Sequence, residues 1–149
     1  MRRSSQGRHG GGLLVGLLAA VALGSTACSG TGGAIRNGLP LLKVSERDFR
    51  IKAPGEVRAG EFRLQVTNEG PDTHELLVVR LDKARLPLRP DGLTVDEAAL
   101  ASSTAVTLEG AERGERREAP VHLAPGRYVL FCNMAGHYLG GMHTVVSVR

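Results

Sequence analysis

The sequence has no tryptophan and few other aromatic residues: three Phe and two Tyr in 149 residues, or 3%. About 42% of the residues are nevertheless hydrophobic, which is enough for a compact core, and the length suits one domain. The core of that domain therefore has to be built mainly from Val, Leu and Ala.

A strong excess of charge of one sign is also absent. The chain has 19 Lys and Arg against 15 Asp and Glu, a net charge of +4. Arg2, Arg3 and Arg8 lie in an N-terminal segment that we expect to be removed. Without them 16 basic residues face 15 acidic ones, a net charge of +1. So balanced a chain gives little support for binding nucleic acid or acidic substrates.

The apolar run near the N-terminus lacks the roughly 20 residues that a membrane-spanning helix needs. It extends from Leu13 to Leu23, is broken only by Gly16, and follows the three arginines. This arrangement is typical of a secretory signal peptide, with the small residues Gly24 to Ala27 at its cleavage site. We therefore expect residues 1–27 to be a signal peptide.

Cys28 follows this segment directly. Ser25-Thr26-Ala27-Cys28 resembles the lipobox of bacterial lipoproteins, although Ser25 stands where Leu is usual. The resemblance implies that Cys28 is lipidated. Residues 28–40 are rich in Gly, Ser and Thr, a composition that predicts a flexible tether. The protein would then be anchored to the outer face of the cell membrane. Ordinary cleavage after Ala27, which leaves a periplasmic or secreted protein, is the alternative.

From Leu41 onward, short stretches of alternating apolar and polar residues lie between turn signals. Strands are predicted at 43–46, 49–52, 62–67, 74–81, 121–123, 127–132 and 144–148. Leu76 to Val79 is apolar on both faces, which favours a central strand. These patterns predict one all-β domain over 41–149, an antiparallel Greek-key β-sandwich of about eight strands.

Residues 82–114 are expected to form an irregular insertion in this sandwich. Thr94 and Glu97 match a capping box, which predicts a short helix from Thr94 to about Ala101. The charged run 112–118 is expected to be a solvated loop or hairpin tip, with a partner-docking patch as the alternative.

Three side chains that can bind a metal recur near the C-terminus, in the pattern Cys132-x4-His137-x4-Met142. A predicted strand ends at Cys132, a glycine-bearing loop carries His137, and Gly140-Gly141 precedes Met142. One loop thus supplies a thiolate, an imidazole and a thioether. A fourth ligand has to come from elsewhere, and His74, at the start of the predicted central strand, is the candidate.

The kinds of ligand favour copper. A thiolate, two imidazoles and a weak thioether are the donor set of blue copper sites. Structural zinc sites use four Cys or His ligands without a thioether, and covalent haem attachment needs Cys-x-x-Cys-His, which is absent. A disulfide between Cys28 and Cys132 is disfavoured, because Cys28 closes the apolar run and Cys132 belongs to the ligand pattern. The sequence predicts one mononuclear copper site.

The segments around these residues resemble the cupredoxins, the superfamily of plastocyanin and azurin. The matching segments are 68–75, 124–132, 136–137 and 141–142, and the resemblance covers about residues 41–149. It implies His74, Cys132 and His137 as equatorial ligands, Met142 as the axial ligand, and His137 as the surface port for electrons. Glu75 departs from the pattern, since plastocyanin and azurin have Asn there.

We therefore expect a monomeric, extracytoplasmic carrier of single electrons that docks weakly with redox partners near His137. The rival function is copper storage, scavenging or delivery, although the chain lacks the Met-rich or His-rich tracts of trafficking proteins. No enzymatic activity is expected. A multicopper oxidase needs His-x-His pairs, a binuclear centre needs a second Cys in the loop, and nitrite reductases need a further all-His copper site.

Overall fold

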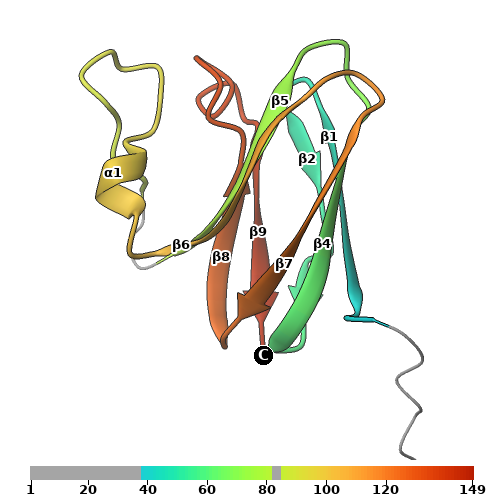
Figure 1. The fold of residues 1–149 in the computed structure, drawn as a ribbon. Coiled ribbons are helices and arrows are strands. Elements are labelled where there is room, and N and C mark those ends of the chain that lie inside the picture. Colours follow the sequence, from blue (N-terminus) through green and yellow to red (C-terminus); the bar gives the residue numbers. More distant parts are fainter. Residues whose placement is uncertain (1–37, 82–84) are drawn as a thin grey trace, which may run out of the picture. The chain divides into compact units, whose positions relative to one another are not determined.

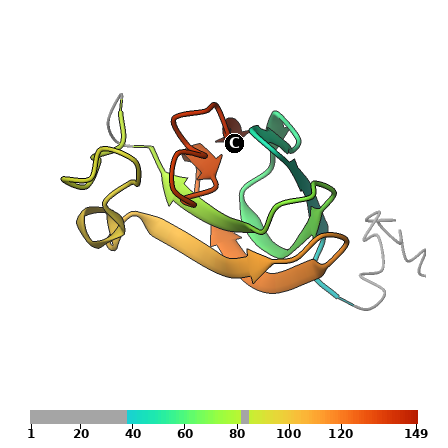
Figure 2. The same cartoon turned by 90° about the horizontal axis from the view of Figure 1, so that it is seen from above.

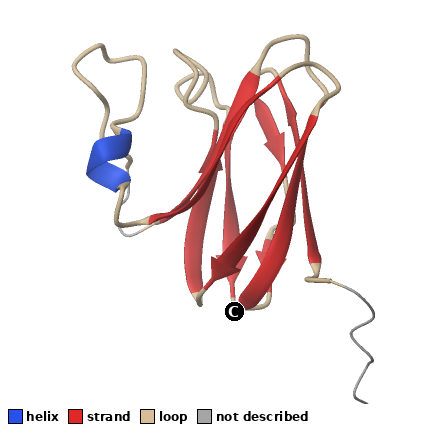
Figure 3. Cartoon of the chain, in the orientation of Figure 1, coloured by secondary structure: helices blue, strands red, loops and turns tan. Residues whose placement is uncertain are grey.

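The computed structural model describes residues 38–81 and 85–149, which form a fold made almost entirely of strands (Figures 1 and 3). The predicted signal peptide, most of the predicted tether and Cys28 lie outside these residues. The described elements are β1 (Leu41–Arg47), β2 (Arg50–Lys52), β3 (Glu56–Val57), β4 (Gly60–Asn68), β5 (His74–Arg80), α1 (Glu97–Leu100), β6 (Thr104–Ala111), β7 (Arg116–Leu123), β8 (Gly126–Phe131) and β9 (His143–Val148). In this part of the chain, no helix has the length and apolarity needed to cross a membrane.

The strands form two sheets that enclose the core (Figure 2). One sheet has the order β2-β1-β4-β7 and the other the order β3-β9-β8-β5-β6. The predicted all-β sandwich is therefore confirmed. Most neighbouring strands are antiparallel, but β1 runs parallel to β4 and β3 runs parallel to β9. The first parallel pair arises because the chain passes through β3 in the second sheet before it returns as β4.

The strand β5 lies between β8 and β6, as the apolar run predicted. Its alternating side chains serve two separate clusters. Leu76 and Val78 join the core between the sheets, whereas Leu77 and Val79 pack with Val95 and Leu100 from the α1 region. The insertion thus covers the outer face of this sheet, which explains why β5 is buried on both sides.

The structure differs from prediction within the insertion. Residues 104–111, expected to be irregular, form the strand β6. The alternation there is weak, because Leu108 and Ala111 are the only fully buried residues of the strand. Residues 112–115 connect β6 to β7, with 112–114 exposed, but the second half of the charged run belongs to β7.

The predicted capping box at Thr94 is wrong. The helix begins at Glu97, and its N-cap is Asp96, whose side chain accepts a hydrogen bond from the Ala99 amide at 3.3 Å. The Thr94 hydroxyl instead donates to Asp91 at 2.7 Å. The Asp91 carboxylate holds this hydroxyl in a turn that precedes the helix, so Thr94 does not cap the helix.

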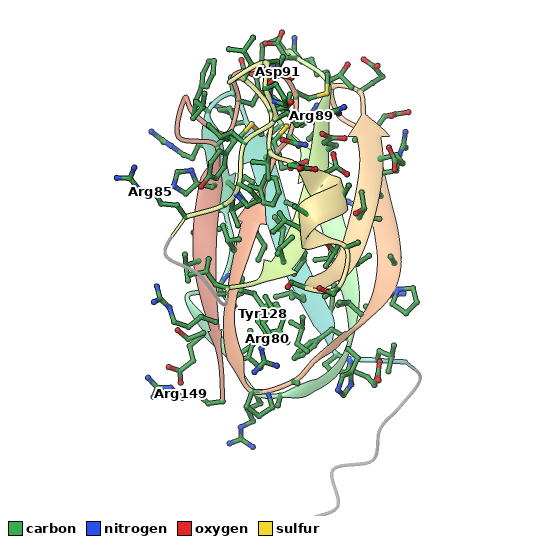
Figure 4. All side chains as sticks on the ribbon, turned by 90° about the vertical axis from the view of Figure 1, so that its left-hand side faces the viewer. Arg80, Arg85, Arg89, Asp91, Tyr128 and Arg149 are labelled. Atoms are coloured by element: carbon green, nitrogen blue, oxygen red, sulfur yellow. The ribbon has the colours of Figure 1, made fainter. Side chains whose placement is uncertain are left out.

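Several connections meet at the end of the sandwich opposite the C-terminus (Figure 1). They include the β1–β2 turn, the β4–β5 loop, the β6–β7 turn and the β8–β9 loop. The insertion, marked by Arg89 and Asp91, reaches the same end, whereas Tyr128 and Arg80 lie toward the other (Figure 4). All the predicted ligands lie on or next to these connections.

Candidate metal centre

His74, Cys132 and His137 come together at this end, with one potential ligand atom of each within 4.8 Å of the others. His74 is the first residue of β5, and Cys132 follows the last residue of β8. These strands are antiparallel neighbours in which Leu77 pairs with Phe131, so the start of β5 lies beside the end of β8. The sheet register therefore juxtaposes two side chains that lie far apart in the sequence.

The loop from Cys132 to Met142 closes on itself through main-chain hydrogen bonds. The Cys132 amide donates to the Met142 carbonyl at 3.2 Å, and the Met142 amide donates to the His137 carbonyl at 2.9 Å. Gly136 and Gly141 adopt φ values of 82° and 98°, a region that L side chains rarely occupy. The loop glycines therefore allow the tight path that returns His137 toward Cys132.

The imidazole of His74 has one nitrogen occupied and the other free. Its Nε2 lies 3.0 Å from Oδ1 of Asp48, and its Nδ1 is buried without a hydrogen-bond partner. Burial lowers the pKa of His74, while the hydrogen bond to Asp48 acts in the opposite direction. The lowered pKa favours the neutral imidazole, the form that binds metals. The unpartnered Nδ1 is then the atom that can bind a metal.

Gly70 leaves room for this hydrogen bond. A Cβ at position 70 would lie 2.7 Å from Oδ1 of Asp48 and 3.0 Å from Nε2 of His74. Any larger residue would push the two groups apart.

The Nδ1 atom of His137 corresponds to Nδ1 of His74. Its Nδ1 lies 3.4 Å from Sγ of Cys132, and its ring meets the His74 ring edge-on at a centroid distance of 5.2 Å. The residue is half-buried, unlike His74 and Cys132, which are fully enclosed. Of the three, His137 alone therefore has a route to solvent.

Burial raises the pKa of the Cys132 thiol to about 11, and the charges of Glu46 and Glu75 act in the same direction. Hydrogen bonds from the main-chain amides of Glu75 and Met134 partly offset this shift. The free thiol therefore keeps its proton at neutral pH. Metal binding has to release that proton, so metal uptake should become easier as pH rises.

Met142 is fully buried in the same apolar cluster as Cys132. The other two histidines of the described part stay apart from the centre. His122 contacts Glu61 at 2.8 Å on the surface, and His143 packs against Tyr138.

Two residues near the centre, Asp48 and Glu46, are not among those predicted from the sequence. Asp48 lies in a turn, where no sequence signal linked it to His74. Glu46 could have been found, because alternation along β1 places it on the same face as the buried Leu42 and Val44. Both oxygens of Glu46 are buried without a hydrogen-bond partner, and burial raises its pKa to about 8, with the Glu75 charge adding to the effect.

The two sheets and the placement of the three side chains define a cupredoxin fold whose His-Cys-His cluster fits a single type 1 copper site. The fold is similar to auracyanin A from Chloroflexus aurantiacus, described as a "blue" copper protein, with 18% identity, a TM-score of 0.56, and 75% of this chain and 100% of that chain covered. Auracyanin from Roseiflexus castenholzii has 17% identity and a TM-score of 0.55 over 75% and 98% of the two chains. Rusticyanin from Thiobacillus ferrooxidans has 12% identity and a TM-score of 0.53 over 73% and 77%. No family model matches the sequence, and no curated protein does either.

Proposed function

We propose that this protein binds one type 1 copper ion and transfers single electrons. The observation that carries the proposal is the convergence of His74, Cys132 and His137 within 4.8 Å, with Nδ1 of His74 buried and unpartnered. An unpartnered buried nitrogen is costly unless a ligand uses it. A thiolate with two imidazoles is the equatorial set of a type 1 site, where copper cycles between Cu(I) and Cu(II).

The proposed ligands have different roles. His74 and Cys132 hold the ion in a buried environment, which excludes water and keeps the site rigid. We propose Met142, buried in the same cluster as Cys132, as the weak axial ligand. His137 then offers the shortest covalent path from the ion to the surface. Redox partner proteins would dock weakly beside it, because a carrier has to leave quickly after transfer.

We also propose that the protein works outside the cytoplasm, anchored at the outer face of the cell membrane through lipid on Cys28. This part rests on the basic, apolar and small-residue pattern that ends at Cys28. The division into signal peptide 1–27, tether 28–40 and domain 41–149 remains a prediction. Cys28→Ala should release the protein from the membrane fraction or block its processing, and a wild-type protein recovered entirely in the soluble exported fraction would contradict the anchor.

A visible spectrum of the copper-loaded protein tests the metal site. The protein should be blue or green, because the Cys132 thiolate donates charge to Cu(II). Cys132→Ser should abolish the colour, whereas His122→Ala, which removes a surface histidine outside the cluster, should keep it. A coloured Cys132→Ser protein would overturn the assignment of the ligand.

A further inference from the structure

We propose that the two-residue turn between β1 and β2, formed by Asp48 and Phe49, is a clamp that holds both histidines of the metal centre in their metal-binding orientation. This inference rests on the proposed function and deepens it, because it assigns positioning residues to the same site. We call the pair the Asp48–Phe49 clamp.

The turn is placed to act on both rings. Arg47 pairs with Arg50 in the β1–β2 ladder, so Asp48 and Phe49 alone make the connection. The turn lies at the end of the sandwich where the β8–β9 loop also lies (Figure 1). The two histidines belong to the opposite sheet and its loop, so the clamp reaches across the sandwich.

Asp48 sets the tautomer of the His74 ring. Its Oδ1 lies 3.0 Å from Nε2 of His74, while Nδ1 of the same ring has no partner. A carboxylate can only accept a hydrogen bond, so the proton of the neutral ring resides on Nε2. This leaves the lone pair of Nδ1 directed to the cluster. Asp48 thus selects the tautomer that can bind a metal.

Phe49 holds the orientation of the His137 ring. It meets His137 edge-on, at a centroid distance of 5.4 Å, although 53% of its surface is exposed. The ring also lies over Gly140, where an added Cβ would clash with it. Gly140 therefore provides the space in which Phe49 reaches His137.

The backbone conformation of Phe49 supports a functional role for its contact with His137. Among the described residues it is the only non-glycine residue with a positive φ, 57°. Gly or Asn is favoured at turn positions of this kind, and a bulky residue there is strained. Such strain persists where the surroundings impose it, and it concentrates at functional sites. The strained turn presents an aromatic ring to the one histidine of the cluster that is partly open to solvent.

The variant Phe49→Gly separates a clamp from a simple turn residue. Glycine accepts a φ of 57° without strain, so the copper-free protein should unfold at the same temperature or higher. Loss of the ring should nevertheless speed the release of copper to a chelator by about tenfold or more, the usual range for residues that orient metal ligands. Phe49→Tyr, which keeps the ring, should restore slow release. Arg50→Gly, the matched control in the same hairpin, should leave the release rate near that of wild type.

The variants of Asp48 are tested in the copper-free protein by nitrogen NMR of the histidine rings. Wild type should show His74 with its proton on Nε2. Asp48→Asn keeps an accepting oxygen and should preserve this tautomer, whereas Asp48→Ala should give a mixture of the two.

These results distinguish failure of the clamp from failure of the proposed function. A wild-type protein that binds copper, together with Phe49→Gly releasing it at the wild-type rate and Asp48→Ala keeping the wild-type tautomer, would overturn the clamp. A wild-type protein that takes up no copper would overturn the proposed function, and the NMR measurement would still show whether Asp48 orients His74.

Discussion

At the scale of single residues, Glu46 is the least expected group of the domain. It lies on the inner face of β1, where its carboxyl group is buried without a hydrogen-bond partner. Burying an ionised carboxylate without a partner is so costly that the group keeps its proton instead. With a pKa raised to about 8, mainly by burial, Glu46 is neutral in most of the folded molecules at pH 7.

The free energy of unfolding of the copper-free protein should therefore fall as pH rises from about 4.5 to about 8, the window between the ordinary pKa of Glu46 and its raised value. In this window the unfolded chain ionises the group and the folded chain does not, so deprotonation favours unfolding. The total loss should be at most about 5 kcal/mol, because the window spans about 3.5 pH units and each unit contributes about 1.4 kcal/mol. Urea unfolding at a series of pH values measures it.

Glu46→Gln is the matched control, since it keeps the shape of the side chain and cannot ionise. The variant should lose the part of the pH dependence that comes from Glu46 and should be more stable than wild type near pH 8. Identical pH profiles of the two proteins would show that Glu46 does not titrate with a raised pKa.

Met142 allows a separate test of the axial position. Met142→Gln or Met142→Leu should keep copper bound and shift the reduction potential, because an axial ligand tunes the potential without holding the ion. His74→Ala should instead disrupt copper binding. Redox titration and metal analysis measure both effects, and equal loss of copper in all three variants would exclude a weak axial role.

At the scale of elements, the side chain of Asn133 joins the insertion to the β8–β9 loop. Asn133, the residue after Cys132, accepts a hydrogen bond from the Val95 amide at 2.6 Å and donates to the Val95 carbonyl at 3.1 Å and to Glu97 at 2.7 Å. The Gly136 amide adds a bond to the Leu93 carbonyl at 3.0 Å. The insertion therefore supports the outer side of the loop that carries His137.

Asn133→Ala should lower the free energy of unfolding by about 1–3 kcal/mol, because it leaves the buried main-chain groups of Val95 without partners. Hydrogen exchange should show faster opening of the α1 region and of the β8–β9 loop together. Asp91→Ala is a useful comparison, since Asp91 bonds only within the insertion, to Leu93 and Thr94, and is exposed. It should cost less, and it should leave the exchange of the loop unchanged. Exchange that changes in only one of the two segments in Asn133→Ala would contradict the coupling.

At the scale of the whole domain, the surface around the metal centre is partly apolar. The end with the metal centre carries exposed apolar side chains in its β1–β2 turn and β8–β9 loop, namely Phe49, Met134 and Leu139. Exposed apolar groups gathered at one place favour a docking surface. Their position around His137 agrees with the proposed path for electrons.

Leu139→Glu should therefore slow electron self-exchange, because it places a charge where two molecules have to approach closely. Leu139 is 52% exposed and is not a ligand, so the visible spectrum and the copper affinity should stay nearly unchanged. NMR line broadening of mixed oxidised and reduced protein measures the rate. Leu39→Glu, an exposed leucine that precedes β1 at the opposite end, is the control. A Leu139→Glu rate equal to wild type would remove His137 as the port, and a store of copper would instead pass its metal rapidly to a chelator.

Features that depend on neighbouring residues could be predicted from the amino-acid sequence. The alternation in β4 and the apolar run in β5 identify strands, because side chains on a strand point to opposite faces in turn. The spacing from Cys132 to Met142 identifies one compact loop, because its closing hydrogen bonds lie within that loop. Even over a few residues, hydrogen bonds between neighbouring side chains can change a predicted cap. Asp91 binds the Thr94 hydroxyl, so Asp96 caps the helix instead.

How groups from distant segments meet depends on the three-dimensional fold. It brings His74 to Cys132 through the pairing of β5 with β8, and it sets Asp48 and Phe49 of one sheet against the two histidines of the other. It also leaves Glu46 buried with no partner, which alternation alone could not reveal. Ring orientation, tautomer and pKa depend on atoms a few ångströms away, and these atoms are supplied by residues tens of positions apart in the chain, so folding alone places them.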